Sequence, residues 1–303
     1  MTTTPLRTRW LLALTLLLFI GFTVGCDSND ADDPTMNIVE LASDTPSLST
    51  LTSAVVAARL DGALSTEDPI TVFAPINGAF TELGESVDAL LANEELLTKV
   101  LQYHVVPGRL EASDLQGRTT LTTLAGQTLR INTENGVMIN NAMVTTANIE
   151  ATNGIVHLID GVLLENLDVV ERASITPELS TLVTAVGAGQ LVGTLQAAEN
   201  ITVFAPTNAA FAKINPSTLN SLLEPANRGQ LQDILQLHVV PQVLFAEDLS
   251  PGAKVGTLLN GGELTVSLGE NAAFVNDIRI VATDIEVSNG VVHLIDEVLL
   301  PTN

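Results

Sequence analysis

The chain has 303 residues, enough for about two domains, and its composition of 46% hydrophobic and 16% charged residues predicts a folded protein with a buried core. Its 35 acidic residues against 12 basic ones give a formal net charge of −23. A surface of this sign repels phosphate backbones, which excludes nucleic acid as the expected partner.

The first 25 residues have the pattern of a secretory leader. Arg7 and Arg9 precede an uncharged apolar run over residues 11–24, which is too short to span a bilayer comfortably. The only cysteine, Cys26, follows in "FTVGC". A lone cysteine is often just a small buried hydrophobe, but this arrangement resembles a bacterial lipoprotein signal. The resemblance implies that Cys26 becomes the first mature residue and carries acyl chains such as palmitate.

The acidic segment "DSNDADDP" after Cys26 has nothing to pack, so residues 26–35 are predicted to be a flexible tether to a membrane. We therefore expect a lipid-anchored, extracytoplasmic protein of the cell envelope, at the outer membrane or cell surface or in the periplasm. Removing residues 1–25 deletes two arginines and no acidic residue, which brings the net charge to −25. Such a surface suits concentrated salt, although acidic secreted proteins are also common.

An internal duplication organises the rest of the chain. "NIVELAS" at 37 matches "DVVERAS" at 168, and "TVFAPINGAF" at 71 matches "TVFAPTNAAF" at 202. "LQYHVVP" and "NGIVHLID" also recur in the second copy as "LQLHVVP" and "NGVVHLID", after small insertions. Each unit is about 130 residues, long enough to hold its own core. We predict two domains, over residues 36–166 and 167–303, with almost no linker.

Each copy begins with helical patterns. Apolar residues at helical spacing predict a helix within residues 45–60, with Thr45 and Pro46 as start signals. The short β-branched run "ITVF" predicts a strand. Asn77 is expected to cap the short helix that follows it and that carries Phe80 inward. Asn208 and Phe211 are the second-copy equivalents.

A further helix is predicted over residues 93–104, and strands dominate the last 50 residues of each copy. Asn153-Gly154 and Asn289-Gly290 lie between two strand patterns and predict hairpins closed by type I′ turns with positive φ angles. Helices first and antiparallel strands last indicate an α+β fold.

Three motifs in a fixed order, twice over, give the chain a family resemblance. "TVFAPTNAAF", the "YHVV" segment and "NGVVHLIDEVLLP" resemble the fasciclin domain, and the match covers residues 36–301. The resemblance implies tandem domains, each a β-sandwich-like wedge of mainly antiparallel strands flanked by helices. It also implies a secreted or surface-anchored protein that mediates adhesion.

The four histidines form two matched pairs. His104 and His238 end apolar helix faces, where they can donate to orphan carbonyl groups, and His157 and His293 lie in strands that are apolar on both faces. A metal site is the alternative, but zinc needs three or four ligands and Asp160 and Asp296 are expected to point away. We interpret the histidines as scaffolding and expect no metal and no cofactor.

Partner-binding candidates follow from the resemblance. In animal members, a Tyr-His pair and an upstream Asp-Ile pair are implicated in integrin recognition. The first copy has the Tyr-His pair but Lys99-Val100 upstream, and the second has the Asp-Ile pair but Leu237 before its histidine. The apolar members are also natural core positions. The candidate contact residues are Tyr103, His104, Asp233, Ile234 and His238.

Other chemistry is sparse. The sequence has no nucleophile elbow, no His-Glu-x-x-His motif and no EF-hand loop, and "GAGQLVG" at 187–193 reads as a loosened helix end, so we expect no enzyme. A glycan partner is less favoured than a protein, because the mature chain has no tryptophan and one tyrosine.

The predicted function is a membrane-anchored adhesion or interaction protein that binds a protein or cell-surface partner through loops such as "LEPANRGQ" or a sheet edge. The alternative is a periplasmic accessory or structural lipoprotein that binds a small ligand or an envelope component.

Overall fold

The computed structural model describes residues 34–66, 68–269 and 272–301. The predicted leader, Cys26 and nearly all of the predicted tether lie outside these residues. From Pro34 onward the chain forms a compact unit that contains both copies of the repeat. In the part of the chain that is described, no helix combines the length and the apolar character needed to cross a membrane.

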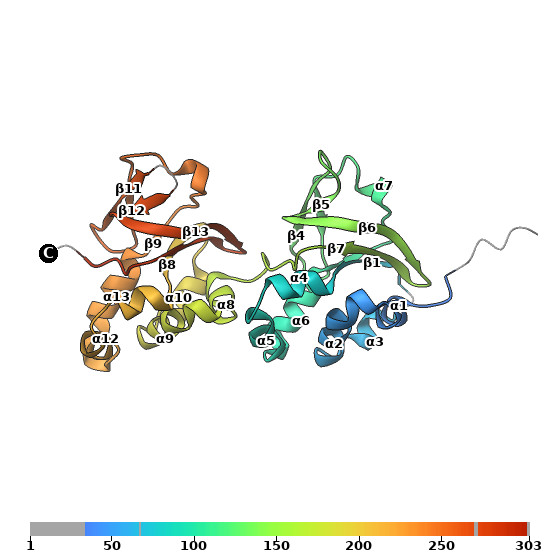
Figure 1. The fold of residues 1–303 in the computed structure, drawn as a ribbon, viewed down its shortest axis with the longest axis horizontal. Coiled ribbons are helices and arrows are strands. Elements are labelled where there is room, and N and C mark those ends of the chain that lie inside the picture. Colours follow the sequence, from blue (N-terminus) through green and yellow to red (C-terminus); the bar gives the residue numbers. More distant parts are fainter. Residues whose placement is uncertain (1–33, 67, 270–271, 302–303) are drawn as a thin grey trace, which may run out of the picture. The chain divides into compact units, whose positions relative to one another are not determined.

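In domain 1, the first copy, every described helix except the last precedes the second strand, and the first strand lies among these helices (Figure 1). Its helices are α1 (Ile38–Asp44), α2 (Ser49–Ala57), α3 (Asp61–Leu64), α4 (Asn77–Glu82), α5 (Ser86–Leu91), α6 (Glu94–Tyr103) and α7 (Ala112–Leu115), with a 3-10 turn over Pro46–Leu48. Its strands are β1 (Ile70–Pro75), β2 (Val105–Pro107), β3 (Thr120–Thr122), β4 (Thr128–Asn132), β5 (Met138–Ile139), β6 (Ala142–Ala151) and β7 (Gly154–Ile159).

Domain 2, the second copy, repeats this order. Its helices are α8 (Val169–Ser174), α9 (Ser180–Ala188), α10 (Val192–Ala197), α11 (Asn208–Ala212), α12 (Pro216–Leu222) and α13 (Arg228–Leu237), with 3-10 turns over Pro177–Leu179, Pro225–Asn227 and Ala246–Asp248. Its strands are β8 (Ile201–Pro206), β9 (Val239–Val240), β10 (Lys254–Gly256), β11 (Glu263–Leu268), β12 (Ala273–Val275), β13 (Ile278–Val287) and β14 (Gly290–Ile295).

Each domain has one seven-stranded sheet. The strand order is β2-β1-β7-β6-β5-β4-β3 in domain 1 and β10-β11-β12-β13-β14-β8-β9 in domain 2. All neighbouring strands are antiparallel except the central pairs β1–β7 and β8–β14, which are parallel. The predicted α+β class with mainly antiparallel strands is therefore confirmed, and the early "ITVF" strand lies beside the last strand of its own repeat.

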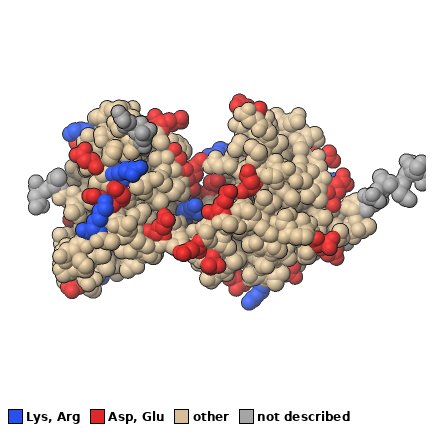
Figure 2. All heavy atoms as spheres, viewed as in Figure 1, with Lys and Arg blue, Asp and Glu red and all other residues tan. Residues whose placement is uncertain are grey.

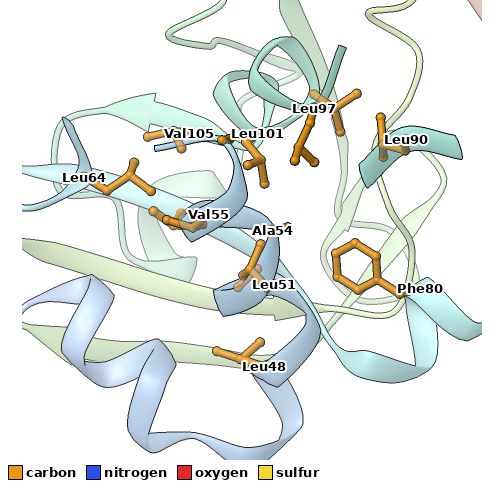
Figure 3. Close-up of a cluster of buried hydrophobic side chains, with 14 of the residues drawn as sticks. Leu48, Leu51, Ala54, Val55, Leu64, Phe80, Leu90, Leu97, Leu101 and Val105 are labelled. Atoms are coloured by element: carbon orange, nitrogen blue, oxygen red, sulfur yellow. The ribbon is translucent and has the colours of Figure 1, made fainter. Parts of the chain in front are cut away.

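The central strands separate two cores in each domain. In β1 the side chain of Val72 enters a core shared with the helices, whereas that of its neighbour Phe73 enters a second core. Figure 3 shows the helix-side core, in which Leu51, Val55, Leu97 and Leu101 converge. In the second core, the outer strands β3–β5 fold back over β1 and β7, which gives the expected sandwich-like wedge. Domain 2 has the same two cores.

The predicted helix cap at Asn77 is wrong. Helix α4 begins after Ile76 without a side-chain cap, and the Asn77 side chain is used by an earlier helix instead. Its Oδ1 accepts the amide of Thr50 at 3.0 Å and its Nδ2 donates to the carbonyl of Pro46 at 2.9 Å. Asn208 makes the equivalent bonds in domain 2, where Thr207 caps α11. The asparagine therefore ties the start of α4 to the start of α2, a role that needs the folded chain.

The hairpins are confirmed but their predicted turn type is wrong. Strand pairing joins Ala151 to Gly154, so the two-residue loop is Thr152-Asn153, and neither Asn153 nor Asn289 takes a positive φ. The Asn153 side chain instead accepts the amide of Ile38 at 2.9 Å and donates to the carbonyl of Leu64 at 2.8 Å.

Glycine is required after this asparagine for a different reason, which is the close approach of the parallel neighbour. A Cβ at Gly154 would lie 1.9 Å from the carbonyl oxygen of Ile70. Gly290 has the same relation to Ile201, also at 1.9 Å. The central parallel pair can form at this spacing only because position 154 or 290 has no side chain.

Candidate functional site

The helix-end histidines bond to the main chain through both ring nitrogens. His104 follows α6 and is 2% exposed. Its Nδ1 lies 2.7 Å from the carbonyl oxygen of Val100, and its Nε2 accepts the amide of Leu163 at 3.0 Å. Because Nε2 must accept, the proton belongs on Nδ1, which donates to the carbonyl. Burial lowers the pKa of His104 to about 4, although the bond to Val100 acts in the opposite direction.

His238 repeats this geometry at the end of α13. Its Nδ1 is 2.8 Å from the carbonyl oxygen of Ile234, and its Nε2 accepts the amide of Leu299 at 3.0 Å. Burial again lowers the pKa to about 4. In each domain a neutral imidazole thus joins the last turn of a long helix to the segment after the last strand.

The strand histidines join the sheet to a connecting loop. His157 lies in β7, with Nε2 placed 2.9 Å from the carbonyl oxygen of Leu110 and Nδ1 accepting the amide of Asn148 at 3.3 Å. Its ring stacks on Phe73 with 5.5 Å between ring centroids. Burial lowers its pKa. His293 has the equivalent partners in domain 2: Leu244, Asp284 and Phe204.

All four imidazoles therefore bond to the main chain, as the scaffolding interpretation requires. Lone pairs that accept amide protons are not free to bind a metal. Among the described residues, no group of three or more His, Cys, Asp or Glu side chains is placed to hold a metal ion. Asp160, which directly follows β7, accepts the amide of Met143 at 2.7 Å.

Tyr103 belongs to a partly buried polar cluster that the sequence did not predict. Its hydroxyl donates to the carbonyl of Thr128 at 3.0 Å and accepts from Asn140 Nδ2 at 3.0 Å. Asn140 also donates to Glu165 Oε2 at 3.0 Å. Burial raises the pKa of Tyr103 to about 12 and also raises the pKa of Glu165. The cluster holds the end of α6 against β4, and the only sequence signal for it was that a buried tyrosine needs a partner.

Domain 2 replaces this cluster with apolar packing. Leu237 takes the place of Tyr103 and enters the second core. Asn276 keeps one function of Asn140, because its Oδ1 accepts the amide of Thr265 at 2.8 Å just as Asn140 accepts that of Arg130. The tyrosine of the "YH" motif therefore belongs to the internal packing of domain 1, and domain 2 packs without it.

The predicted contact residues are not brought together on a surface. Tyr103, His104, Ile234 and His238 are buried, at 2–6% exposure, and Asp233 is the one member with an exposed side chain. Val100 and Leu237, which the sequence analysis describes as natural core positions, are also buried. The assignment of these five residues to partner binding stays a prediction, and the structure limits direct contact in the folded state to Asp233.

Asp233 borders the surface where the two domains differ most. In domain 1, α5 and α6 are joined by two residues, whereas five residues join α12 to α13. Asn227 anchors the longer connection by donating to the carbonyl of Ser221 at 2.7 Å. We call this the α12–α13 surface, and its exposed members are Glu224, Pro225, Ala226, Gly229, Gln230 and Asp233.

The surface charge is predominantly negative. Figure 2 shows acidic side chains distributed over the drawn face of each domain, with few lysines or arginines on domain 1 and several among the acidic groups of domain 2. Some are paired within a domain, as where Arg109 meets Glu150 at 2.9 Å and Lys254 meets Glu263 at 3.1 Å. Both pairs are solvent exposed and therefore contribute little stability.

Comparison with known proteins gives a match to one family model. The model described as the fasciclin domain matches residues 46–165 and again residues 177–301. The two matches fall on the two seven-stranded units.

Three similar proteins illustrate the range of relatives. Protein sll1483 of Synechocystis sp. is 45% identical over 141 residues, covering 45% of this chain and 78% of that protein. Transforming growth factor-beta-induced protein ig-h3 of Sus scrofa is 34% identical over 238 residues, 76% of this chain but only 34% of that protein. A solved FAS1 domain pair from the insect cell adhesion molecule Fasciclin I aligns with a TM-score of 0.44 and 22% identity, over 84% of this chain and 97% of that one.

Proposed function

Because this chain belongs to the fasciclin domain family, we propose that it is a lipid-anchored, extracytoplasmic protein of the cell envelope that binds a protein or cell-surface partner through its two domains. Fasciclin domains are known from adhesion proteins, in which they bind partners and do not catalyse reactions. We place the protein in the same non-enzymatic class.

The anchoring part of the proposal rests on the N-terminal sequence. A basic leader segment, a 14-residue apolar run and Cys26 in immediate succession fit lipoprotein processing. More than one acyl chain is needed for stable membrane attachment, at about 0.8 kcal/mol per buried methylene. The acidic residues that follow Cys26 would keep the domains hydrated and away from the bilayer.

The observation that carries the contact part is the α12–α13 surface. The histidines, the tyrosine and the isoleucine of the family motifs are all buried, so a partner must use other groups. The α12–α13 surface is exposed, anchored by Asn227 and absent in this form from domain 1, and it contains Asp233. Loops held by a rigid scaffold are common recognition surfaces. A carboxylate at this position favours a partner with a basic contact group.

Binding to whole cells tests the contact. The chain from residue 34 onward, labelled with a fluorophore, is added to intact cells of the source organism that lack the protein, and bound label is measured by flow cytometry. We expect saturable binding that Asp233→Arg weakens at least tenfold. Asp88→Arg on α5 changes the net charge by the same amount at an exposed site in domain 1 and is expected to bind normally. Equal loss in both variants, or binding that does not saturate, contradicts the proposed contact.

Membrane fractionation tests the anchor separately. The full chain is expected to partition with membranes and to carry acyl groups on Cys26 by mass spectrometry, whereas Cys26→Ser is expected to be released in soluble form. An unmodified Cys26 with an uncut leader contradicts the anchor and leaves the contact proposal to its own test.

A further inference from the structure

Domain 2 contains an apolar cavity of about 260 Å³ between its helices and its sheet. It is bounded by α8, α9 and α10 on one side and by β8 and the end of α13 on the other, and it opens to solvent at one side. Its buried aliphatic lining includes Leu182, Val186, Leu195, Val203, Leu235 and Val239. None of its lining residues is an aspartate, glutamate, lysine or arginine.

In domain 1 the equivalent cavity is nearly filled by side chains. The corresponding cavity is lined by Ile38, Leu51, Val55, Leu64, Leu101 and Val105, which are the repeat equivalents of domain 2 lining residues, but its volume is only about 40 Å³. An unfilled space costs stability, because the atoms around it lose their packing partners. The fold therefore does not require the larger cavity, and its presence in domain 2 needs a cause in the sequence.

Three replacements each reduce side-chain volume at or beside the cavity in domain 2. Ile38 becomes Val169, which removes one methyl group from the lining. Val56, which borders the small cavity, becomes Gly187. Buried Ala58 becomes Gly189, and Leu235 Cδ1 lies 3.0 Å from the position that a Cβ at Gly189 would take. Leu235 therefore packs closely against Gly189, where a methyl group would crowd it.

We propose that this cavity is a binding site for a small uncharged apolar molecule of about ten carbon atoms. A cavity of about 150 Å³ accommodates benzene, which gives roughly 25 Å³ per carbon and therefore about ten carbons here. This site is separate from the α12–α13 surface and does not depend on the adhesion role.

The lining determines which ligands fit. His238 borders the cavity, but both of its ring nitrogens are already bonded to the main chain, so it offers no charge and no free donor. A buried carboxylate or ammonium group would find no partner and would lose its hydration. The other polar side chains in the lining are Thr194, which is exposed, and Gln236, which is half-buried. One hydroxyl or carbonyl group on the ligand can face them, with the hydrocarbon part inside.

Calorimetry with 1-naphthol tests the site, because this probe has ten carbons and one hydroxyl group. The chain from residue 34 onward is used, since it holds both sheets and all four cores. We expect one 1-naphthol per chain with a Kd below 1 mM, and binding of 1-naphthoate at least tenfold weaker at pH 7, because its carboxylate is charged.

The duplication supplies matched controls. Leu258 lines the cavity rim and is 38% exposed, and Leu124 is its exposed counterpart in domain 1. We expect Leu258→Asp to weaken 1-naphthol binding at least tenfold and Leu124→Asp to leave it unchanged. Ala173→Leu should fill the cavity and abolish binding, whereas Ala42→Leu in domain 1 should not. Absence of binding to the folded wild type, two probes per chain, equal binding of 1-naphthoate, or equal effects in the two domains would each overturn the proposal. If Ala173→Leu fails to fold, 1-naphthol binding to the Leu258→Asp variant, whose substitution is at the exposed rim, still tests the proposal.

Discussion

Lowering the pH from 7 to 5 is expected to destabilise each domain, because the folded domain holds its helix-end histidine in the neutral form. The pKa of His104 and of His238 is about 4 in the folded chain, against 6.5 for the unfolded residue. Below pH 6.5 the unfolded state takes up protons that the folded state does not, so stability falls as the pH falls, until about pH 4. At pH 5 the loss amounts to about 2 kcal/mol for each of these histidines.

This loss is large beside a total domain stability of about 5–15 kcal/mol. The window between pH 7 and 5 also lies above the range in which most carboxylates take up protons, so the histidine effect is separable from the acidic surface. His157 and His293, whose pKa values burial also lowers, add to the loss in the same direction.

Urea unfolding of the chain from residue 34 onward at pH 7, 6 and 5, followed by far-ultraviolet circular dichroism at constant ionic strength, measures the effect. The double variant His104→Gln/His238→Gln is expected to be less stable at pH 7, because main-chain bonds are lost. Its stability should nevertheless depend less steeply on pH, since two of the four titrating groups are gone. The same pH slope in the variant and the wild type would refute the reasoning. So would imidazole NMR signals of His104 and His238 that titrate near pH 6.5 in the folded chain.

The remaining predictions concern packing and charge. Gly154→Ala is expected to lower the free energy of unfolding in urea by about 3 kcal/mol or more, because its Cβ would overlap the carbonyl of Ile70. In the control Gly62→Ala the added Cβ meets nothing within 4 Å, so the free energy of unfolding should change by less than about 1 kcal/mol. Similar values for both variants would contradict the close approach at Gly154. Asn77→Ala should cost about 1–2 kcal/mol through the loss of the bonds to α2, and no measurable loss would show that these bonds are dispensable. Raising salt to the molar range should increase the unfolding midpoint, because it screens repulsion among 35 acidic residues; full stability at low ionic strength with no gain from salt would contradict the salt-adaptation hypothesis.

Features carried by local pattern were predictable from the sequence. Apolar spacing placed the helix that the structure has at Glu94–Tyr103, and it put His104 on the buried side at the helix end. The duplication shows each motif twice, and in both copies the strand histidine has apolar neighbours on either side, which is enough to predict that it is internal. The asparagine-glycine pairs marked the two hairpins correctly.

Features that depend on a distant neighbour were not predictable in this way. Asn77 stands at the start of one helix but bonds to the start of another helix about 30 residues earlier. Gly154 looked like a turn residue, yet its constraint comes from Ile70 on the parallel strand. The partners of Tyr103 and the cavity of domain 2 likewise arise from residues that tertiary packing brings together.

The adhesion role itself is most directly tested by surface attachment of living cells. A strain from which the gene is deleted is compared with the parent and with the deletion strain carrying either the full chain or Cys26→Ser, and retained cells are counted after washing. We expect that deletion reduces attachment or clumping and that the full chain restores it while Cys26→Ser does not. Attachment at the parental level in the deletion strain, with the protein absent from the parental surface, would contradict it.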